Sequence, residues 1–302
     1  MILTHGDGST SAVDHSKRFV PERFSPLFYT AAYAELTPEQ RLRYNQLHGC
    51  YCNEQVMFLE RSVADPVLAA LLLSPGSSPL AAKLRSFLEE EQRHQRLFAE
   101  LNRLCFPRLY EQGEFHFIAL SQGLKAAAGW AARHPFLFPL FVWLMLLEEE
   151  RMVFFGREIL RCKEALEPHF VAVHRAHLAD EIGHVQWDEE ILDWLWPETA
   201  SLLRKANAGL LRWLIGEFFV TPKRSNMRVI VELTREFPEL KPRRAKMRGQ
   251  LLALQNHPGW NRSLHSPMTV PKTIARLQAN PEFISLHEIL VRDWKEHEDN
   301  HH

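Results

Sequence analysis

Two copies of the motif Glu-x-x-His constrain the fold of this chain more than any other feature. The first copy runs from Glu91 to His94, and the second runs from Glu181 to His184, about 90 residues further along. Positions i and i+3 lie on one face of an α-helix, so each copy places a carboxylate beside an imidazole. Paired copies on two helices of a four-helix bundle hold two metal ions between them. A single copy would be weak evidence, because Glu and His are common on solvated helix faces.

A third histidine extends the second motif. His177 precedes Glu181 by four residues, so His177, Glu181 and His184 share one helical stripe. We expect His177 to be an additional metal ligand; the alternative is a core histidine that is satisfied by hydrogen bonds. His174 lies on the same stripe, but about 10 Å from Glu181 along the helix axis. We therefore expect His174 near the mouth of the site, outside the set of ligands.

The rest of the sequence favours helices throughout. Glycine is scarce, at 13 of 302 residues, and strand-like alternation is hard to find. Thr37-Pro38 opens the first clear helix, with Gln40 completing a capping box, and Glu167-Pro168 opens the helix of the second motif. We expect an all-α protein with a four-helix bundle core and additional peripheral helices. Residues 1–302 form one domain in this prediction, with an irregular arm over 1–35 and peripheral helices over 221–302.

Composition excludes several classes of function. The net charge is -1, from 36 basic and 37 acidic residues, so the basic excess of a nucleic-acid surface is missing. The most apolar run, Phe136 to Leu147, is too short to span a bilayer. The N-terminus lacks the apolar stretch of a signal peptide, and the four cysteines form no Cys-x-x-Cys pair. We expect a cytoplasmic protein without nucleic-acid or membrane partners; a homodimer stays open.

An internal repeat predicts the remaining carboxylate ligands. A shift of 96 residues pairs Glu54 with Glu150 and also pairs the apolar residues around them, such as Phe58 with Phe154. Each carboxylate therefore lies in an apolar helical stripe, where an unpaired charge is costly. Each of these helices also precedes a Glu-x-x-His helix, which is the ligand order of a duplicated helix pair around two metals. We expect Glu54 and Glu150 to bind metal.

Other carboxylates compete for these two places. Glu60 competes with Glu54, but its equivalent in the repeat is Gly156, which has no side chain to bind a metal. Glu148 and Glu149 compete with Glu150, which is preferred because it matches Glu54. Two further carboxylates, Asp180 and Glu90, each directly precede the Glu of a motif. They could accept the outer ring N–H of a ligand histidine and so fix its tautomer.

The whole pattern resembles the non-haem di-iron N-oxygenases of the p-aminobenzoate N-oxygenase type. In that family, the third histidine distinguishes the site from those of ribonucleotide reductase small subunits, desaturases and ferritins. The resemblance covers roughly residues 40–215 and implies a ferritin-like bundle, two iron ions and oxidation of an amine nitrogen. No arginine lies on the stripes beside Glu54 or Glu150, where one could anchor a substrate carboxylate. The residues that carry the resemblance are Glu54, Glu91, His94, Glu150, His177, Glu181 and His184.

These ligands suggest a redox enzyme. Mixed carboxylate and imidazole ligation suits iron better than closed structural zinc, with manganese as the alternative. We expect an oxygenase that uses O₂ as co-substrate, oxidises a small aromatic or apolar amine, and takes electrons from a reductase or small reductant. The alternatives are a di-iron hydroxylase or desaturase acting on carbon, and a ferritin-like iron-binding protein without turnover. The predicted pocket lining is Tyr51, Phe58, Phe87, Phe98, Trp143 and Phe154.

Overall fold

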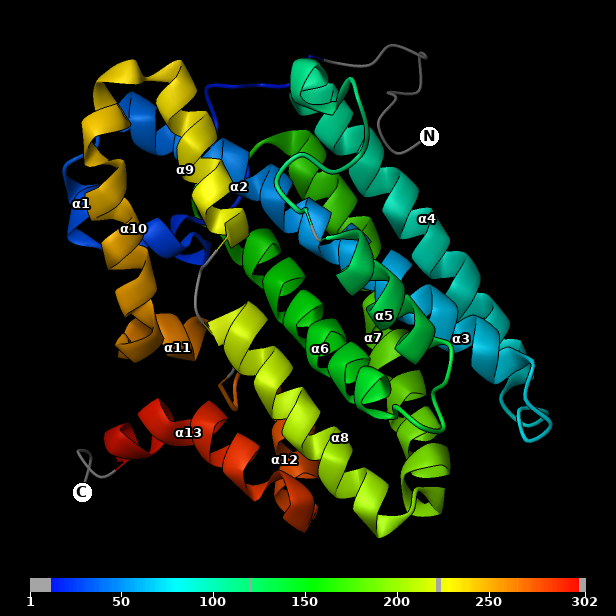
Figure 1. Cartoon of the computed structure of the whole chain (residues 1–302). Coiled ribbons are helices and arrows are strands. Elements are labelled where there is room, and N and C mark those ends of the chain that lie inside the picture. Colours follow the sequence, from blue (N-terminus) through cyan, green and yellow to red (C-terminus); the bar gives the residue numbers. More distant parts are fainter. Residues whose placement is uncertain (1–11, 120, 221–223, 265, 299–302) are drawn as a thin grey trace.

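The computed structural model describes residues 12–119, 121–220, 224–264 and 266–298, and these ranges contain helices and loops but no β-strand (Figure 1). Four long helices build the core, and their contacts join them into a ferritin-like bundle. The all-α prediction is confirmed. The core helices are α2 (Pro38–Leu59), α4 (Ala81–Cys105), α6 (Leu140–Arg161) and α7 (Pro168–Glu198).

Local sequence signals explain where the core helices begin. The Thr37 side chain accepts a hydrogen bond from the backbone N–H of Gln40, whose side chain binds the Thr37 backbone in return. This reciprocal capping box satisfies two N–H groups that a helix start would otherwise leave without acceptors. At the start of α7, the Glu167 carboxylate accepts from the backbone N–H of Phe170. Both predicted helix starts are therefore confirmed.

The end of α2 differs from a regular helix. After Leu59 the chain makes a π-helical turn, Glu60–Ala64, before it continues as α3 (Asp65–Leu72). The wider turn buries Glu60, Val63 and Ala64 in the interior. Such π-turns within α-helices occur frequently at functional sites.

The connection between α4 and α6 is irregular before its helix begins. That helix, α5, spans Gln122–Ala132. The reason is that the backbone N–H groups of residues 116–118 donate to the Glu54 carboxylate instead of to helical carbonyls. The segment is therefore held as an irregular loop against α2.

The C-terminal third consists of several short helices. After α8 (Ser201–Leu214) and a π-helical turn at Ile215–Val220, the chain forms α9 (Arg224–Glu236), α10 (Arg244–Ala253) and α11 (Pro258–Leu264). The helices α12 (Pro271–Ala279) and α13 (Ile284–Glu298) follow. These helices lie along one side of the bundle, where α9 packs on α2 and α12 packs on α6 (Figure 1).

The N-terminal arm is only partly irregular. Its described part contains two short 3₁₀ turns, Glu22–Phe24 and Pro26–Tyr29, and one helical turn, α1 (Ala31–Ala34). Residues 1–11 of the predicted arm lie outside the described residues. Within the described ranges, no helix has the length and apolar content that crossing a membrane requires.

Two apolar clusters fill the interior and leave a polar centre between them. One cluster joins the N-terminal arm, α2, α7 and α9 and includes Phe98; the other joins α3, α6, α8, α12 and α13 and includes Phe87. Phe98 contacts His177, with ring centroids 4.9 Å apart, and Phe87 stacks on His184 at 4.1 Å. The charged residues at the centre are thus enclosed by apolar packing on both sides, which excludes water.

Candidate metal centre

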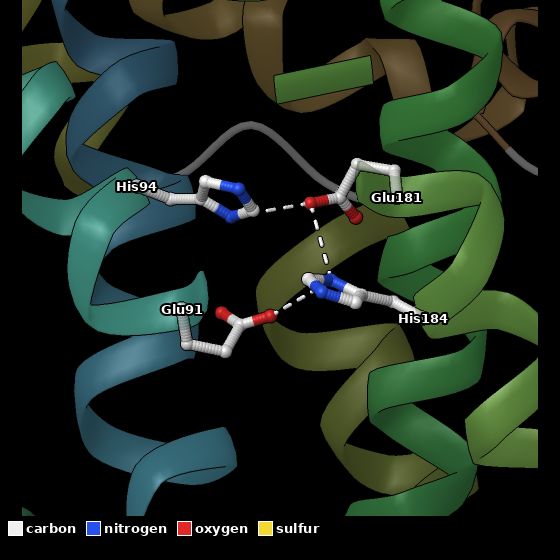
Figure 2. Close-up of side chains that lie close together, drawn as sticks. All are labelled: Glu91, His94, Glu181 and His184. Atoms are coloured by element: carbon white, nitrogen blue, oxygen red, sulfur yellow. Dashed lines mark ion pairs between the residues drawn. The ribbon is translucent and has the colours of Figure 1, made fainter. Parts of the chain in front are cut away.

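The structure brings the two Glu-x-x-His motifs together. Glu91 and His94 project from α4, and Glu181 and His184 project toward them from α7 (Figure 2). The four side chains are at most 1% exposed, and one ligand atom from each lies within 4.8 Å of all the others. Two carboxylates and two imidazoles at this spacing are a suitable donor set for a metal ion.

A second group adjoins the first one. Glu60, His94 and His177 also place one ligand atom each within 4.8 Å of one another. His177 Nε2 lies 2.8 Å from a Glu181 oxygen and 3.4 Å from a Glu60 oxygen. The same Glu181 oxygen lies 3.4 Å from His94 Nδ1 and 3.5 Å from His184 Nδ1. Glu181 therefore stands between the two groups.

A carboxylate from α6 completes the centre on the His184 side. Nδ1 of His184 lies 3.1 Å from Glu91 Oε1 and 3.8 Å from Glu149 Oε2. Glu149 is buried on α6, and Glu60 is buried in the π-helical turn that follows α2. Each of the four core segments thus contributes at least one side chain.

Several atoms that face the centre lack the partner that burial demands. Among the described residues, both oxygens of Glu91 and Glu181 and Nδ1 of His94 and His184 make no hydrogen bond of acceptable geometry, although these nitrogens and oxygens lie close to one another. Unsatisfied buried polar atoms are rare and costly. Burial raises the pKa of Glu91 to about 7, and burial and the neighbouring carboxylates raise that of Glu60 well above its usual range. These residues fit metal ions, which would replace the missing partners and neutralise the charge.

The outer nitrogens of the two motif histidines are held by carboxylates in a crossed arrangement. His94 Nε2 lies 3.0 Å from Asp180 Oδ2, and His184 Nε2 lies 2.9 Å from Glu90 Oε2. Each carboxylate therefore serves the histidine of the opposite motif. An Nε2–H bond to a carboxylate leaves Nδ1 without its proton and turned to the centre, which is how metal-bound histidines are usually oriented.

Comparison with known families agrees with this geometry. The chain matches the family model described as p-aminobenzoate N-oxygenase AurF over residues 7–253. The chain belongs to the AurF family. The members of this family are di-iron N-oxygenases, which are oxidoreductases of the monooxygenase type. No curated protein and no solved structure gave a significant match to the chain.

Two residues that we expected to bind metal lie elsewhere in this AurF-family protein. The Glu54 carboxylate accepts hydrogen bonds of 2.8–3.1 Å from the backbone N–H groups of residues 116–118 and from the Tyr110 hydroxyl. The Glu150 carboxylate accepts from the backbone N–H groups of residues 272 and 273, at 2.8 and 2.7 Å, where α12 begins. Both carboxylates are already satisfied, and neither belongs to the two groups around Glu181.

Glu60 and Glu149 stand in the places that we assigned to Glu54 and Glu150. A signal for Glu60 was present in the sequence. Glu60 precedes Glu91 by 31 residues, whereas Glu54 precedes it by 37. In the second half, Glu149 and Glu150 precede Glu181 by 32 and 31 residues. Similar spacing in the two halves therefore favours Glu60 over Glu54, but it does not distinguish Glu149 from Glu150.

The expected aromatic lining is divided among several places. Phe87 and Phe98 contact the ligand histidines. Trp143 instead packs against other aromatic side chains in the apolar core, 4.5 Å from Phe283 between ring centroids. Tyr51, Phe58 and Phe154 line cavities outside the ligand groups. Trp143 is therefore a core residue, because it packs against Trp196 of α7 and against Phe283 in the turn between α12 and α13.

Three cavities meet beside the centre. The smallest, about 30 Å³, has Glu60, Glu149, His177 and Glu181 in its wall and is the open face of the metal centre. A polar cavity of about 90 Å³ shares Val56, Glu148 and Met152 with it. An apolar cavity of about 170 Å³ shares Leu59, Val63 and Leu144 with it.

The polar cavity contains residues that the sequence placed less clearly. His174 is in its wall, and burial lowers the pKa of this histidine to about 3, so it is uncharged. Arg151 is in the same wall. No arginine lies on the stripes of Glu54 and Glu150, and Arg151 was missed because it lies on a different stripe of α6.

Proposed function

We propose that this AurF-family protein binds two iron ions and uses O₂ to oxidise the nitrogen of a small aromatic or apolar amine. The observation that carries the proposal is the set of buried ligand atoms that face one another without hydrogen-bond partners among the described residues. One ion would be held by Glu60, His94 and His177, the other by Glu91, Glu149 and His184, and both by Glu181.

Iron is the metal that this donor set favours. Mixed carboxylate and imidazole ligation is typical of non-haem iron oxygenases, with manganese as the nearest alternative. Iron bound here supplies the electrons that reduce O₂. The chain's own contribution is to hold seven ligands in a dry interior and to leave one open face, at the 30 Å³ cavity. That volume accommodates about one water molecule, so O₂ and an amine nitrogen must displace water to enter.

The walls of the open face favour an uncharged nitrogen. Apart from its ligands and Glu148, the small cavity is lined by apolar side chains such as Val56, Leu144 and Met145. An ammonium group would lose its hydration there with little compensation. An aromatic amine is uncharged at neutral pH and suits this surface. We infer that such an amine is oxidised to a hydroxylamine and onward to nitroso or nitro products, with electrons from a reductase or a small reductant.

The test combines metal analysis with product analysis. Protein loaded anaerobically with Fe(II) should retain about two irons per chain. It should then consume O₂ in the presence of aniline and place ¹⁸O from labelled O₂ on nitrogen, as read by mass spectrometry. Label on carbon would favour the hydroxylase alternative, and O₂ consumption without any oxidised amine would favour an iron-storage role. Binding of one iron or none would refute the assignment of the centre.

A further inference from the structure

The polar cavity of about 90 Å³ is placed to receive the part of the substrate that does not react. It shares three wall residues with the cavity at the open face of the centre, so the two spaces adjoin. An amine whose nitrogen enters the small cavity would extend its ring past Val56 and Met152. The substituent opposite the nitrogen would then lie in the polar cavity.

The charges in this cavity cancel one another. Of the described residues in its wall, Glu148 and Arg151 carry the formal charges. They lie one helical turn apart on α6, and Nη1 of Arg151 is 2.7 Å from both oxygens of Glu148. Their side chains are only 10% and 17% exposed. His48, also in the wall, adds no charge, because burial lowers its pKa to about 4.

The same wall offers polar atoms that are not yet satisfied. Nδ1 of His48, Nε2 of His174 and Oδ1 of Asn226 have no hydrogen-bond partner within the part of the chain that the structure describes. Buried polar atoms in native proteins nearly always have a partner. Donors and acceptors on a bound ligand would supply the partners that these three atoms lack.

We propose that this cavity binds an uncharged, hydrogen-bonding substituent of the substrate, such as an amide or a hydroxyl, and discriminates against a carboxylate. The inference rests on the proposed function for the identity of the reacting amine. A substrate carboxylate would have to share Arg151 with Glu148, so two buried carboxylates would depend on one cation. An uncharged amide makes hydrogen bonds with the wall and leaves the ion pair intact.

The test uses two probes that differ in one charge and almost nothing else, p-aminobenzamide and p-aminobenzoate. Their affinities are measured by calorimetry on the iron-loaded protein without O₂. We expect the amide to bind more tightly, by roughly 10- to 100-fold, which is the usual weight of a hydrogen bond to a charged group. In Glu148→Gln, the guanidinium of Arg151 no longer pairs with a carboxylate of this wall, so the carboxylate of p-aminobenzoate can take that place. The preference should then reverse toward p-aminobenzoate.

A matched control separates the local pair from the overall charge. Glu164→Gln removes the same charge from an exposed ion pair with Arg18, where the two side chains lie 2.7 Å apart. This variant should keep the wild-type preference. If Glu148→Gln does not fold, the other member of the ion pair is changed instead, in Arg151→Gln. It leaves Glu148 without its cation, so a cationic probe, p-aminobenzylamine, should bind more tightly than it does to the wild type.

Clear outcomes contradict the proposal. The proposal is overturned if the wild type binds p-aminobenzoate as tightly as p-aminobenzamide or more tightly, or if it does not bind p-aminobenzamide. It is also overturned if neither Glu148→Gln nor Arg151→Gln changes the preference between the probes. Because binding is measured without O₂, the two proposals can fail separately. If p-aminobenzamide binds more tightly than p-aminobenzoate but no amine nitrogen is oxidised, only the proposed function is refuted. Oxidation of both probes with equal affinity refutes only the selection against carboxylates.

Discussion

The two helix pairs of the bundle, α2–α4 and α6–α7, build their halves of the metal centre in nearly the same way. Each pair offers one carboxylate from its first helix region, Glu60 or Glu149, and one Glu-x-x-His motif from its second helix. The carboxylates are separated by 89 residues and the motifs by 90. The repeat that matters for the centre is therefore six or seven residues, or about two helical turns, shorter than the 96-residue repeat of the apolar stripes.

The pairs differ where the sequence departs from this repeat. A shift of 90 residues places His177 of α7 at the position of Phe87 on α4. Phe87 stacks on a ligand histidine, whereas His177 lies 2.8 Å from Glu181 and 3.4 Å from Glu60. The position that Phe87 uses for aromatic packing is thus taken on α7 by His177, which we propose as a metal ligand. The centre is a symmetric frame with one extra imidazole, on the side of Glu60 and His94.

The halves also share a feature that has no part in metal binding. Glu54 and Glu150 each hold a segment that crosses the bundle, by accepting hydrogen bonds from its backbone N–H groups. Burial raises the pKa of both carboxylates, and these backbone bonds oppose that effect. The comparison teaches that a buried carboxylate on an apolar stripe is not enough to predict a ligand. What distinguishes Glu60 and Glu91 is that they keep oxygens without hydrogen-bond partners among the described residues.

The largest expected effect tests whether the halves share one residue. Glu181 lies within 3.5 Å of imidazole nitrogens in both groups. Glu181→Ala should therefore lose both irons, whereas Glu149→Ala should lose one, because Glu149 approaches only His184. Iron is counted by elemental analysis after anaerobic loading and removal of free metal. If Glu181→Ala keeps one tightly bound iron, Glu181 serves a single position and the halves are more independent than we infer.

A smaller effect distinguishes the two kinds of buried carboxylate. Glu54→Gln should keep the iron content but lower the free energy of unfolding by about 2–3 kcal/mol, because its amide group opposes backbone donors. Glu60→Gln should lower the iron content instead. It should not destabilise the metal-free protein, because it removes a charge that is buried beside Glu91 and Glu181. Urea unfolding of the metal-free proteins measures both stabilities.

The second half provides the matched pair. Glu150→Gln should lower the free energy of unfolding by less than Glu54→Gln does, because the Glu150 carboxylate accepts fewer hydrogen bonds than the Glu54 carboxylate. Glu149→Gln should lower the iron content instead. The opposite pattern, with iron lost from Glu54→Gln and stability lost from Glu60→Gln, would restore the ligands that the longer repeat predicts.

Much of the fold could be predicted because its signals are local. The capping box at Thr37 and the Glu167-Pro168 start depend on residues a few positions apart, so the sequence shows them directly. The loop at residues 116–118 could not be predicted, since its hydrogen-bond acceptor, Glu54, lies more than 60 residues away. The same is true of α12, whose first N–H groups bind Glu150 on α6.

The site could be predicted where one helix carries several of its residues. His177, Glu181 and His184 share a stripe of α7, and their spacing alone predicts that they face one way. Glu60 stands in a π-helical turn, where a regular helical phase no longer applies. Its supposed equivalent, Gly156, lets α6 approach α7 closely, since an added Cβ would lie 3.1 Å from the Cβ of Leu178. The longer repeat failed because it aligned apolar packing rather than the faces that meet at the centre.

The smallest expected effect tests the crossed carboxylates, Asp180 and Glu90. Each accepts the outer ring N–H of one ligand histidine, and losing such a partner typically weakens metal affinity by about 10- to 100-fold. Asp180→Asn should weaken the ion bound by His94, and Glu90→Gln the ion bound by His184. Asp180 is also held by Arg93 at 2.6 Å, so its loss should have the larger effect. Stepwise iron binding is followed by calorimetry.

Double variants show which ion each carboxylate serves. Glu60 and Asp180 act on the ion on the His94 side, so adding Asp180→Asn to Glu60→Gln should change the remaining affinity little. Adding Asp180→Asn to Glu149→Gln should weaken both ions, because those residues act on opposite sides. If Asp180→Asn weakens iron binding by the same factor in both double variants, Asp180 does not act on one ion alone. The crossed arrangement would then be a feature of packing, and the two halves would influence their ions only through Glu181.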